Sequence, residues 1–563
     1  MQSGFTGKPT EIALVAELVY SDIFNDVDVD VVFTHAGGDS WRVPAFWAGD
    51  NVFRCRFAAP MAGDYTWRSE CTNAVDPGLH GRSGKLVVQP YDGGCDLYRH
   101  GRLRVAPSKR TLEHADGTPF LWLADTWWMG LCKRLDWPDG FRRLVEDRVR
   151  KGFSAVQIVA GPLPDFCATV ATWDPQQTNE AGWPWEKDFA RINPEFYDLA
   201  DLRLAYMVEQ GLVPCILSMW GYYLPFMGVE RCKRHWRYLV ARYGAYPVAW
   251  CVAGETDMVT YSLKWVQQTQ AAKDEVERHH RLQREGWTEV AGYLKAIDPF
   301  GNPITTHPSR PDSRAMLEDE SALDLNMLQT GHSGYGSLRA SVDLLSQSLA
   351  KTPTMPTFIS EACYEGIMGG SSAEVQRFLF WASVTLGACG FTYGAQGIWA
   401  MSSRDEPFTG TTSSWGDGFW QDVMHYPGSG QVGVGATILR RYPWSQLAPC
   451  AETTARLGHP YSFVARIPGK LIMAYSPPNC FPAEIAGLRA DWSGALLGLA
   501  IEPGARYRAY YVNPRTGEEV RSYFARGRQE VELGEVVPNE AGFWTPPPKP
   551  TMEDWLLVLE AGK

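Results

Sequence analysis

The sequence lacks the short motifs of several common enzyme classes. It has no glycine-rich phosphate loop of the Walker type, and no nucleophile-elbow pentapeptide stands between a strand and a helix. Kinase and serine-hydrolase functions are therefore excluded. The twelve cysteines are scattered without the short spacing of a zinc or thiol-redox motif, and several, such as Cys215, Cys251 and Cys389, lie inside apolar runs. We expect them to be reduced core residues.

The sequence also lacks an excess of positive charge and a long apolar run. Lys and Arg number 53 against 64 Asp and Glu, and the net charge of -11 gives no broad attraction for nucleic acid phosphates. No uninterrupted apolar run approaches roughly 18 residues, and Met1 to Pro9 does not show a basic stretch followed by an apolar one. We expect a cytoplasmic protein with no membrane or nucleic acid partner and a neutral or weakly charged substrate.

What the chain does have is length and many aromatic side chains. At 563 residues it is too long for one ordinary domain. Aromatic residues reach 13%, with 23 tryptophans, and such rings often wall the clefts that bind sugars, although most are expected to be core. The hydrophobic pattern divides the chain into three predicted domains: 1–92, 93–449 and 450–563.

The first and last of these segments show short alternating stretches separated by turn residues. In the first, Asp28–Thr34 and Asn51–Phe57 are examples, and frequent strands with glycine-containing turns predict an antiparallel β-sandwich. Alternation returns after Pro449, for example in Tyr461–Ile467 and Leu471–Tyr475, which predicts a small terminal β domain.

The central segment repeats an apolar strand followed by an amphipathic helix. Buried parallel strands appear in sequence as continuous apolar runs, so the repeat predicts a (β/α)8 barrel of the TIM type. The eight expected strands are Phe120–Ala124, Ala155–Ala160, Val213–Met219, Val248–Ala253, Ile304–Thr306, Leu325–Gln329, Thr357–Ser360 and Gly390–Tyr393. Of the intervening segments, Lys264–Glu285 is so polar that a solvated helical insertion is predicted there, ahead of a separate helix over Thr288–Ile297.

Two carboxylates end strands of this predicted barrel. Glu255 follows the fourth strand and Glu361 follows the seventh. The carboxyl ends of parallel barrel strands meet at one mouth, and glycosidases need one protonated and one ionised carboxyl group on either side of the scissile bond. We therefore predict Glu255 and Glu361 as the catalytic pair. The alternatives are that each only forms an ion pair or caps a helix, or that Asp257 or Glu365 takes the role of its neighbour.

Other polar and aromatic residues also fall at strand ends and are predicted to bind substrate. Each could equally serve as a packing residue, and Asp125 could instead hold the barrel floor. Two histidines of the set could be metal ligands, but no third ligand recurs at helical spacing, so we predict neither a metal nor a cofactor. The set is Asp125, Trp127, Gln157, Trp220, His307, His332, Tyr393 and Gln396.

Several motifs resemble one known family. The stretch Phe120–Trp128, followed by Arg148–Gln157, is similar to the opening of the apiosidase-like barrels of glycoside hydrolase family 140, and Asn193–Tyr197 continues the likeness. The upstream segment resembles the small β module that precedes these barrels, and the tail resembles a module named for collagen binding. The resemblance implies a glycosidase barrel whose acids follow strands four and seven, which map onto Glu255 and Glu361.

One departure from the family pattern bears on specificity. Such barrels commonly have Gly-Gly-Asp after strand four, whereas this chain has Ala253-Gly254-Glu255, which moves the carboxyl group by about one methylene. Apiose specificity is therefore not carried over. The sequence predicts a glycoside hydrolase, retaining and exo-acting, that cleaves a plant- or microbe-derived oligosaccharide or glycoside. The competing hypotheses are a non-catalytic carbohydrate-binding protein and a protein-binding role for the tail; the sugar, the linkage and a homo-oligomeric state stay open.

Overall fold

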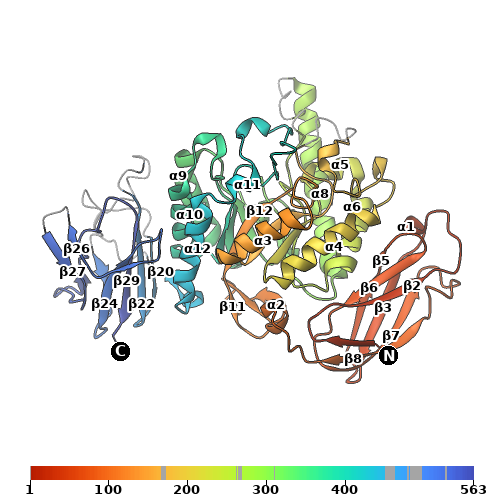
Figure 1. Cartoon of the computed structure of the whole chain (residues 1–563), viewed down its shortest axis with the longest axis horizontal. Helices are drawn as coiled ribbons and strands as arrows, with labels where there is room; N and C mark the ends of the chain where they lie inside the picture. Colours follow the sequence, from red (N-terminus) through yellow and green to blue (C-terminus); the bar gives the residue numbers. More distant parts are fainter. Residues whose placement is uncertain are drawn as a thin grey trace.

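A computed structural model describes residues 2–165, 173–260, 263, 269–309, 311–450, 463–478, 481, 498–525 and 529–562. Three parts follow one another along the long axis of the molecule: a β-rich part with the amino terminus, a central barrel, and a β-rich part with the carboxyl terminus (Figure 1). The predicted combination of an α/β barrel with flanking all-β parts is confirmed. The boundaries after residues 92 and 449 stay predictions.

The amino-terminal part is a sandwich of two sheets. Its buried residues alternate along the strands, as in β3, where Val29, Val31 and Phe33 face inward. Phe33 stacks on Phe57 of the opposite sheet with ring centroids 4.1 Å apart. One sheet has the order β1 (Gln2–Phe5), β8 (Ser83–Gln89), β7 (Gly63–Cys71), β3 (Val29–His35) and β4 (Ser40–Pro44), and the other β2 (Thr10–Val15), β6 (Val52–Phe57) and β5 (Phe46–Trp47). A small sheet of β9 (Leu103–Val105), β10 (Leu112–His114) and β11 (Pro119–Phe120) leads into the barrel.

The central part has the eight predicted strands in one parallel sheet. Every residue of these strands is buried, which explains their continuous apolar sequences. Around the sheet the strands are β16 (Ile304–Thr305), β15 (Ala249–Cys251), β14 (Val213–Leu217), β13 (Ala155–Val159), β12 (Trp122–Trp127), β19 (Gly390–Tyr393), β18 (Thr357–Glu361) and β17 (Asn326–Gln329).

The barrel has one seam, between β16 and β17, where the described residues form no strand ladder. The carbonyl of Ile304 accepts the backbone N–H groups of Asp324 and Leu325 at 2.7 and 3.1 Å. Farther up, the Ser313 hydroxyl accepts the Met327 N–H at 2.8 Å and donates to the Thr306 carbonyl at 2.5 Å. Backbone hydrogen bonds at Ile304 and the side chain of Ser313 thus join the two edge strands in place of a ladder.

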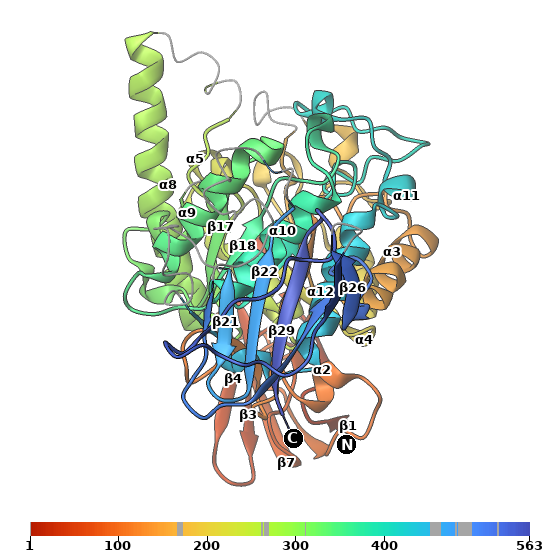
Figure 2. The same ribbon diagram turned by 90° about the vertical axis from the view of Figure 1, so that its left-hand side faces the viewer.

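The helices cover the outside of the barrel, and one of them differs from expectation. Instead of an insertion and a separate helix, α8 is a single helix from Gln270 to Ile297 whose first half projects beyond the barrel mouth (Figures 1 and 2). A buried stripe of Val276, His279, Gln283 and Trp287 continues along it at helical spacing. Polar residues within this stripe hid the periodicity. The other long helices are α3 (Asp139–Arg150), α4 (Pro194–Glu209), α6 (Val229–Tyr243), α9 (Leu338–Leu349), α10 (Ala373–Thr385) and α12 (Pro427–Arg440).

The carboxyl-terminal part is the predicted small β domain, and the strands of its main sheet pair antiparallel. Of the predicted strand over Tyr461–Ile467, positions 461 and 462 lie outside the described residues, and strand β21 begins at Val464. Its main sheet has the order β20 (Ala448–Pro449), β21 (Val464–Ile467), β22 (Leu471–Ser476), β29 (Trp555–Ala561), β24 (Tyr507–Val512) and β25 (Glu519–Val520), and two-stranded sheets pair β23 (Leu499–Ala500) with β28 (Phe543–Trp544) and β26 (Ser522–Ala525) with β27 (Gln529–Glu532).

This part docks on helix α10 through stacked rings and a buried ion pair. Tyr475 stacks on Trp381 with an interplanar angle of 17°. The Arg377 guanidinium donates to both oxygens of Asp554 at 2.9 Å, and Arg515 and the Tyr475 hydroxyl complete the hydrogen bonding of that carboxylate at 2.7 and 3.0 Å. Because Asp554 is fully buried, its charge depends on these donors.

The docking contact can be tested with Arg377→Met. This change leaves the buried Asp554 carboxylate without its bidentate partner, so we expect a loss of about 3 kcal/mol in unfolding free energy. The control is Arg404→Met, whose partner Asp422 and own side chain are both more than half exposed; it should cost less than about 1 kcal/mol. Denaturant unfolding of both variants checks this, and equal losses would contradict the role given to the Arg377–Asp554 pair.

Candidate active site

Glu255 and Glu361 lie together at the carboxyl end of the barrel strands. Glu361 is the last residue of β18, and Glu255 follows β15. One amide group lies between them: Gln329 Nε2, at the end of β17, donates to Glu255 Oε1 at 3.0 Å and to Glu361 Oε1 at 3.1 Å. The nearest oxygens of the two carboxyl groups are therefore no farther apart than two hydrogen-bond lengths.

Two histidines hold the Glu361 carboxylate. His307, beyond β16, places Nε2 2.7 Å from Oε2, and His332, beyond β17, places Nε2 2.8 Å from Oε1. Burial is the largest single influence on the pKa of Glu361 and raises it, but the hydrogen bonds and charges of the two histidines outweigh burial and hold the pKa well below its usual range. Glu361 is the acid of the pair that stays ionised.

Glu255 has the opposite environment. Burial, and after it the charge of Glu361, raise the pKa of Glu255. Hydrogen bonds from the Trp220 indole at 3.0 Å and from Gln329 act in the other direction without reversing the effect. Neighbouring carboxyl groups whose pKa values are moved apart can serve as a proton donor and an ionised partner.

The backbone next to Glu255 is shaped by glycine and by strain. A Cβ atom on Gly254 would lie 2.2 Å from the Trp220 ring, so only glycine lets that indole reach the strand end and hold Glu255. Glu255 itself has a φ of 34°, in the left-handed region. A non-glycine residue in that region costs of order 1–3 kcal/mol, and such strain clusters at functional sites.

The two acids open into a cavity of about 550 Å³. This volume is in the range that holds a small-molecule ligand. Aromatic rings form much of the wall: Trp128 meets Trp220 edge to face at 5.4 Å, and Tyr364 stacks on Trp399 with a 20° angle. The lining residues come from beyond every barrel strand: Trp128, Pro164, Asp165, Trp220, Glu255, Asp257, Ser309, Gln329, Gly331, His332, Glu361, Tyr364, Met368, Trp399, Thr412 and Trp415.

The predicted substrate-binding residues divide between the lining and the layer behind it. Trp220 and His332 line the cavity. His307 is buried behind Glu361, and Gln157 donates to the Ser360 carbonyl at 2.9 Å, next to that acid. Gln396 accepts the indole N–H of Trp399, a lining residue, at 3.1 Å. His307, Gln157 and Gln396 thus hold neighbouring residues of the site in position.

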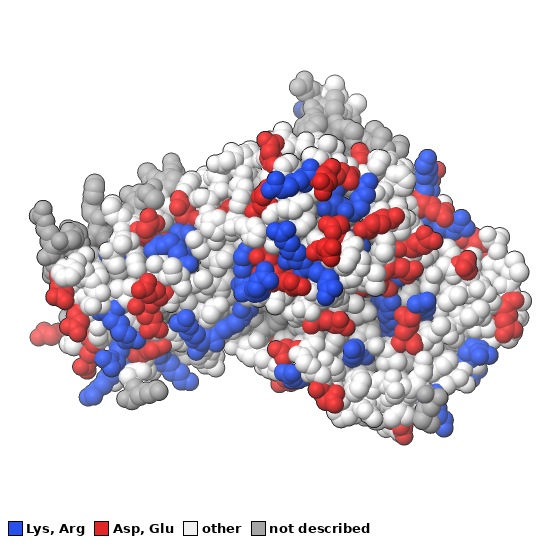
Figure 3. Space-filling view, in the orientation of Figure 1, with Lys and Arg blue, Asp and Glu red and all other residues white. Residues whose placement is uncertain are grey.

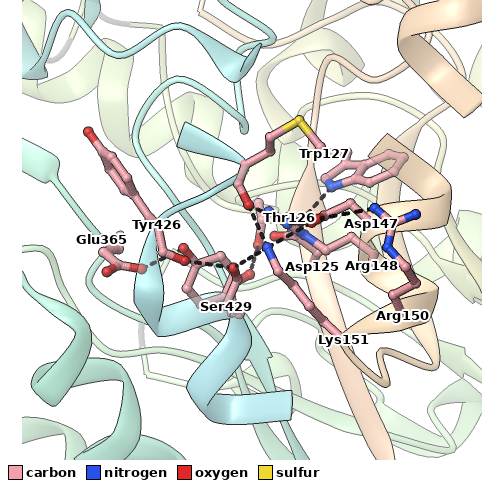
Figure 4. Close-up of polar contacts among 12 residues, drawn as sticks. Asp125, Thr126, Trp127, Asp147, Arg148, Arg150, Lys151, Glu365, Tyr426 and Ser429 are labelled. Carbon is pink, nitrogen blue, oxygen red and sulfur yellow. Dashed lines mark hydrogen bonds and ion pairs between the residues drawn. The ribbon is translucent and has the colours of Figure 1, made fainter. Parts of the chain in front are cut away.

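Asp125 and Trp127 belong to a buried ionic network outside the cavity lining (Figure 4). Asp125 Oδ2 accepts the Trp127 indole N–H at 2.7 Å and Arg148 Nε at 2.6 Å. Arg148 continues to Asp147 at 2.5 Å and to the Met424 carbonyl at 3.1 Å, which ties β12 and α3 to the segment before α12. The arrangement corresponds to the alternative in which Asp125 holds the barrel together, and a sugar contact for it has no support in this geometry.

The two rival acids have different surroundings. Asp257 lines the cavity and accepts a hydrogen bond from Ser309. Glu365 lies outside the lining, where it accepts the Tyr393 hydroxyl at 2.6 Å and the Gly428 N–H at 3.1 Å, close to Tyr426 (Figure 4). Burial raises the pKa of Glu365. Glu365, with the predicted residue Tyr393, thus anchors the start of α12.

Several lining residues were missed in the sequence, among them Trp128, Gln329, Tyr364, Trp399 and Trp415. For one of them a signal exists. Side chains alternate along a strand, so Trp127 and the following Trp128 must point in opposite directions, and only one of the two can face the cavity. Gln329 ends β17, and Tyr364, Trp399 and Trp415 stand in loops, where no periodicity marks side-chain direction.

The described residues contain no group of three or more histidine, cysteine, aspartate or glutamate side chains arranged to hold a metal ion. Nor does any helix in the described part of the chain combine the length and apolarity needed to cross a bilayer. His307 and His332 both turn Nε2 toward Glu361.

Comparison with known proteins gives two family matches and several structural ones. Residues 106–446 match the model described as "Apiosidase-like, catalytic domain", and residues 8–72 match a domain of unknown function, DUF5060. No curated protein sequence matches. A protein from Bacteroides vulgatus described as a candidate glycoside hydrolase is 15% identical over all of both chains, with a TM-score of 0.68. A family 5 glycoside hydrolase from the same species is 19% identical, with 82% of this chain and 94% of that chain covered and a TM-score of 0.60.

The environment of Glu255 predicts a stability effect with a defined pH dependence. A carboxyl group whose folded pKa is raised destabilises the fold once pH exceeds its unfolded pKa, and the penalty grows until pH passes the folded pKa. Glu255→Gln removes this charge, so we expect the variant to be more stable than wild type at pH 8 by about 1 kcal/mol, with the difference vanishing near pH 4. Thermal melts across this range check it; Asp257→Asn, on the same loop, is the control. A Glu255→Gln variant less stable at pH 8 would contradict the assignment.

Proposed function

This chain belongs to the apiosidase-like catalytic-domain family, and we propose that its barrel cleaves glycosidic bonds with retention. In this proposal Glu361 acts as nucleophile and Glu255 as general acid/base. That the chain is a glycosidase follows from the family. The proposal concerns how it works. One observation carries it: a single Gln329 nitrogen contacts both carboxyl groups. Retaining enzymes hold their carboxyl groups about 5–5.5 Å apart, whereas inverting enzymes need about 6.5–9.5 Å to admit a water molecule.

In the first step the Glu361 carboxylate attacks the anomeric carbon while the Glu255 proton passes to the departing glycosidic oxygen. The low pKa of Glu361 keeps the nucleophile ionised, and the raised pKa of Glu255 keeps the donor protonated. Bonding neutralises Glu361, which removes the second of the two influences, after burial, that raised the pKa of Glu255. In the second step Glu255 takes a proton from water, the oxygen of which attacks the anomeric carbon and releases Glu361.

The cavity supports exo action on a neutral glycoside. Residues from beyond all eight strands line it, so the wall runs around its whole circumference and favours one end of a substrate over the middle of a chain. The aromatic wall suits the apolar faces of sugar rings. Apiose is not proposed as the glycone, because Glu255 stands where the family commonly has aspartate. A plant- or microbe-derived glycoside remains the proposed class. Cytoplasmic location, self-association and a collagen-binding type of tail stay predictions.

A non-catalytic sugar-binding protein is the alternative, and the two acids argue against it. Hydrogen bonding to sugar hydroxyls needs no separation of pKa values. Here one acid is held ionised by two histidines while its neighbour is pushed toward the protonated state. This division of roles is needed for acid/base chemistry.

The two roles can be separated through the leaving group. Glu361→Ala should abolish turnover of every nitrophenyl glycoside that wild type cleaves, by a factor of about 10⁴ or more. Glu255→Ala removes only proton donation, so substrates with poor leaving groups should suffer most and activated aryl glycosides least. Azide should rescue the two variants with opposite anomeric products, because it replaces the nucleophile in one and attacks the glycosyl-enzyme in the other.

The controls are Glu365→Gln and Asp257→Asn. Glu365 lies outside the lining, so its change should alter stability without any dependence on the leaving group. Asp257 lines the cavity and should affect KM more than kcat. Near-normal activity of Glu361→Ala would overturn the assignment, and so would a leaving-group-dependent loss of activity in Asp257→Asn that is absent from Glu255→Ala.

A further inference from the structure

One apolar side chain at the mouth of the cavity, that of Met368, is left largely exposed. Met368 belongs to the short helical turn η7 (Ile367–Gly369) in the loop beyond β18. Met368 lines the cavity, yet it is 61% exposed. Glu361, at the end of β18, is only 5% exposed. Met368 therefore stands at the rim while the acids stand at the floor.

The backbone of this turn holds Met368 in an unfavourable conformation. Its φ is 49°, in the left-handed region, between Gly366 at 84° and Gly369 at 65°. A third glycine would adopt this conformation without strain, whereas a side chain with a Cβ atom costs free energy there. Since the side chain is mostly exposed, the fold does not recover this cost by burying it. The loop presents an apolar group at the expense of stability.

A flat aromatic surface adjoins Met368 on the same rim. Turn η7 packs against turn η8 (Ser413–Trp415), and a Cβ atom on Gly416 would lie 3.7 Å from the Gly366 carbonyl oxygen. Trp415, half-buried and lining the cavity, has its ring 5.8 Å from that of His332, which contacts Glu361. Apolar surface thus continues from the rim toward the catalytic floor.

We propose that Met368 and Trp415 form a subsite for the leaving group, and that it takes a flat apolar face such as an aryl aglycone. The inference rests on the proposed function, because the scissile bond must lie at Glu255 and Glu361 on the floor. In an exo-acting pocket the glycone fills the floor, and the leaving group extends to the rim. A thioether is unbranched, polarizable and well suited to pack on aromatic groups of varied shape. Met368 is thus a specificity residue.

The test compares pairs of ligands that share a glycone and differ in the leaving group. Binding of p-nitrophenyl and methyl glycosides from a panel of sugars is measured by titration calorimetry on Glu361→Ala, which does not consume the ligand, and on the same protein with Met368→Ala, Met368→Gly or Met552→Ala added. Met552, in the carboxyl-terminal part, is also mostly exposed, at 73%, and serves as the matched control. Disaccharides of the same glycone show whether the face recognised is aryl or that of a second sugar ring.

With Met368 in place the nitrophenyl glycoside should bind roughly five- to twentyfold more tightly than its methyl counterpart. Both Met368 variants should lose most of this preference, and Met552→Ala should keep it. Met368→Gly should melt at the same or a higher temperature than wild type, since glycine relieves the strain at this φ. If Met368 instead served to stabilise the fold, Met368→Gly would melt at a lower temperature than wild type.

The outcomes separate this inference from the proposed function. If the preference exists and depends on Met368 but no glycoside is hydrolysed, the subsite stands and the proposed function falls. If glycosides are hydrolysed but the preference is absent, or persists in both Met368 variants, the subsite is overturned and the proposed function stands. Failure of every glycoside to bind overturns both.

Discussion

The carboxylate of Glu361 is the interaction on which the rest of this site depends. Its hydrogen-bond partners come from both sides of the barrel seam: His307 follows β16, Gln329 ends β17 and His332 follows it. The two strands lack a ladder and are joined lower down through Ile304 and Ser313. An ionised Glu361 therefore closes the top of the seam as well as opposing Glu255. The same charge adds to burial in raising the pKa of Glu255, and the Glu361 carboxylate holds His307 and His332 of two neighbouring loops.

Around this centre the molecule places layers of support with different chemistry. Buried side-chain amides such as Gln157 and Gln396 bond the strand of Glu361 and the lining ring Trp399. Farther out, full ion pairs are used, as between Asp125 and Arg148. The outer ion pairs thus join secondary-structure elements, while the side-chain amides support the site without adding a charge beside the two acids.

Much of the barrel and the place of its two acids could be predicted from the sequence, because barrel strands are continuous apolar runs that end in polar residues. The eight strands and the position of Glu255 and Glu361 at one mouth follow from that pattern. Side-chain direction did not follow as easily: Asp125 and Trp127 face the framework, whereas Trp128 faces the cavity. The prediction divided helix α8 into two segments, because the polar residues His279 and Gln283 occupy its buried stripe. Met368 and Trp415 lie in loops whose course depends on contacts between distant segments, which no local pattern encodes.

The docking of the carboxyl-terminal part on α10 also sets an order in time. Domains fold largely as they leave the ribosome, amino-terminal ones first. The barrel can close once its eighth strand and α12 have emerged, but Asp554, which neutralises the buried Arg377, is made more than a hundred residues later. During that interval the face of α10 that carries Arg377 and Trp381 is uncovered. A nascent chain of this protein is therefore prone to aggregate through this face of α10 until β29 is made and completes the last sheet.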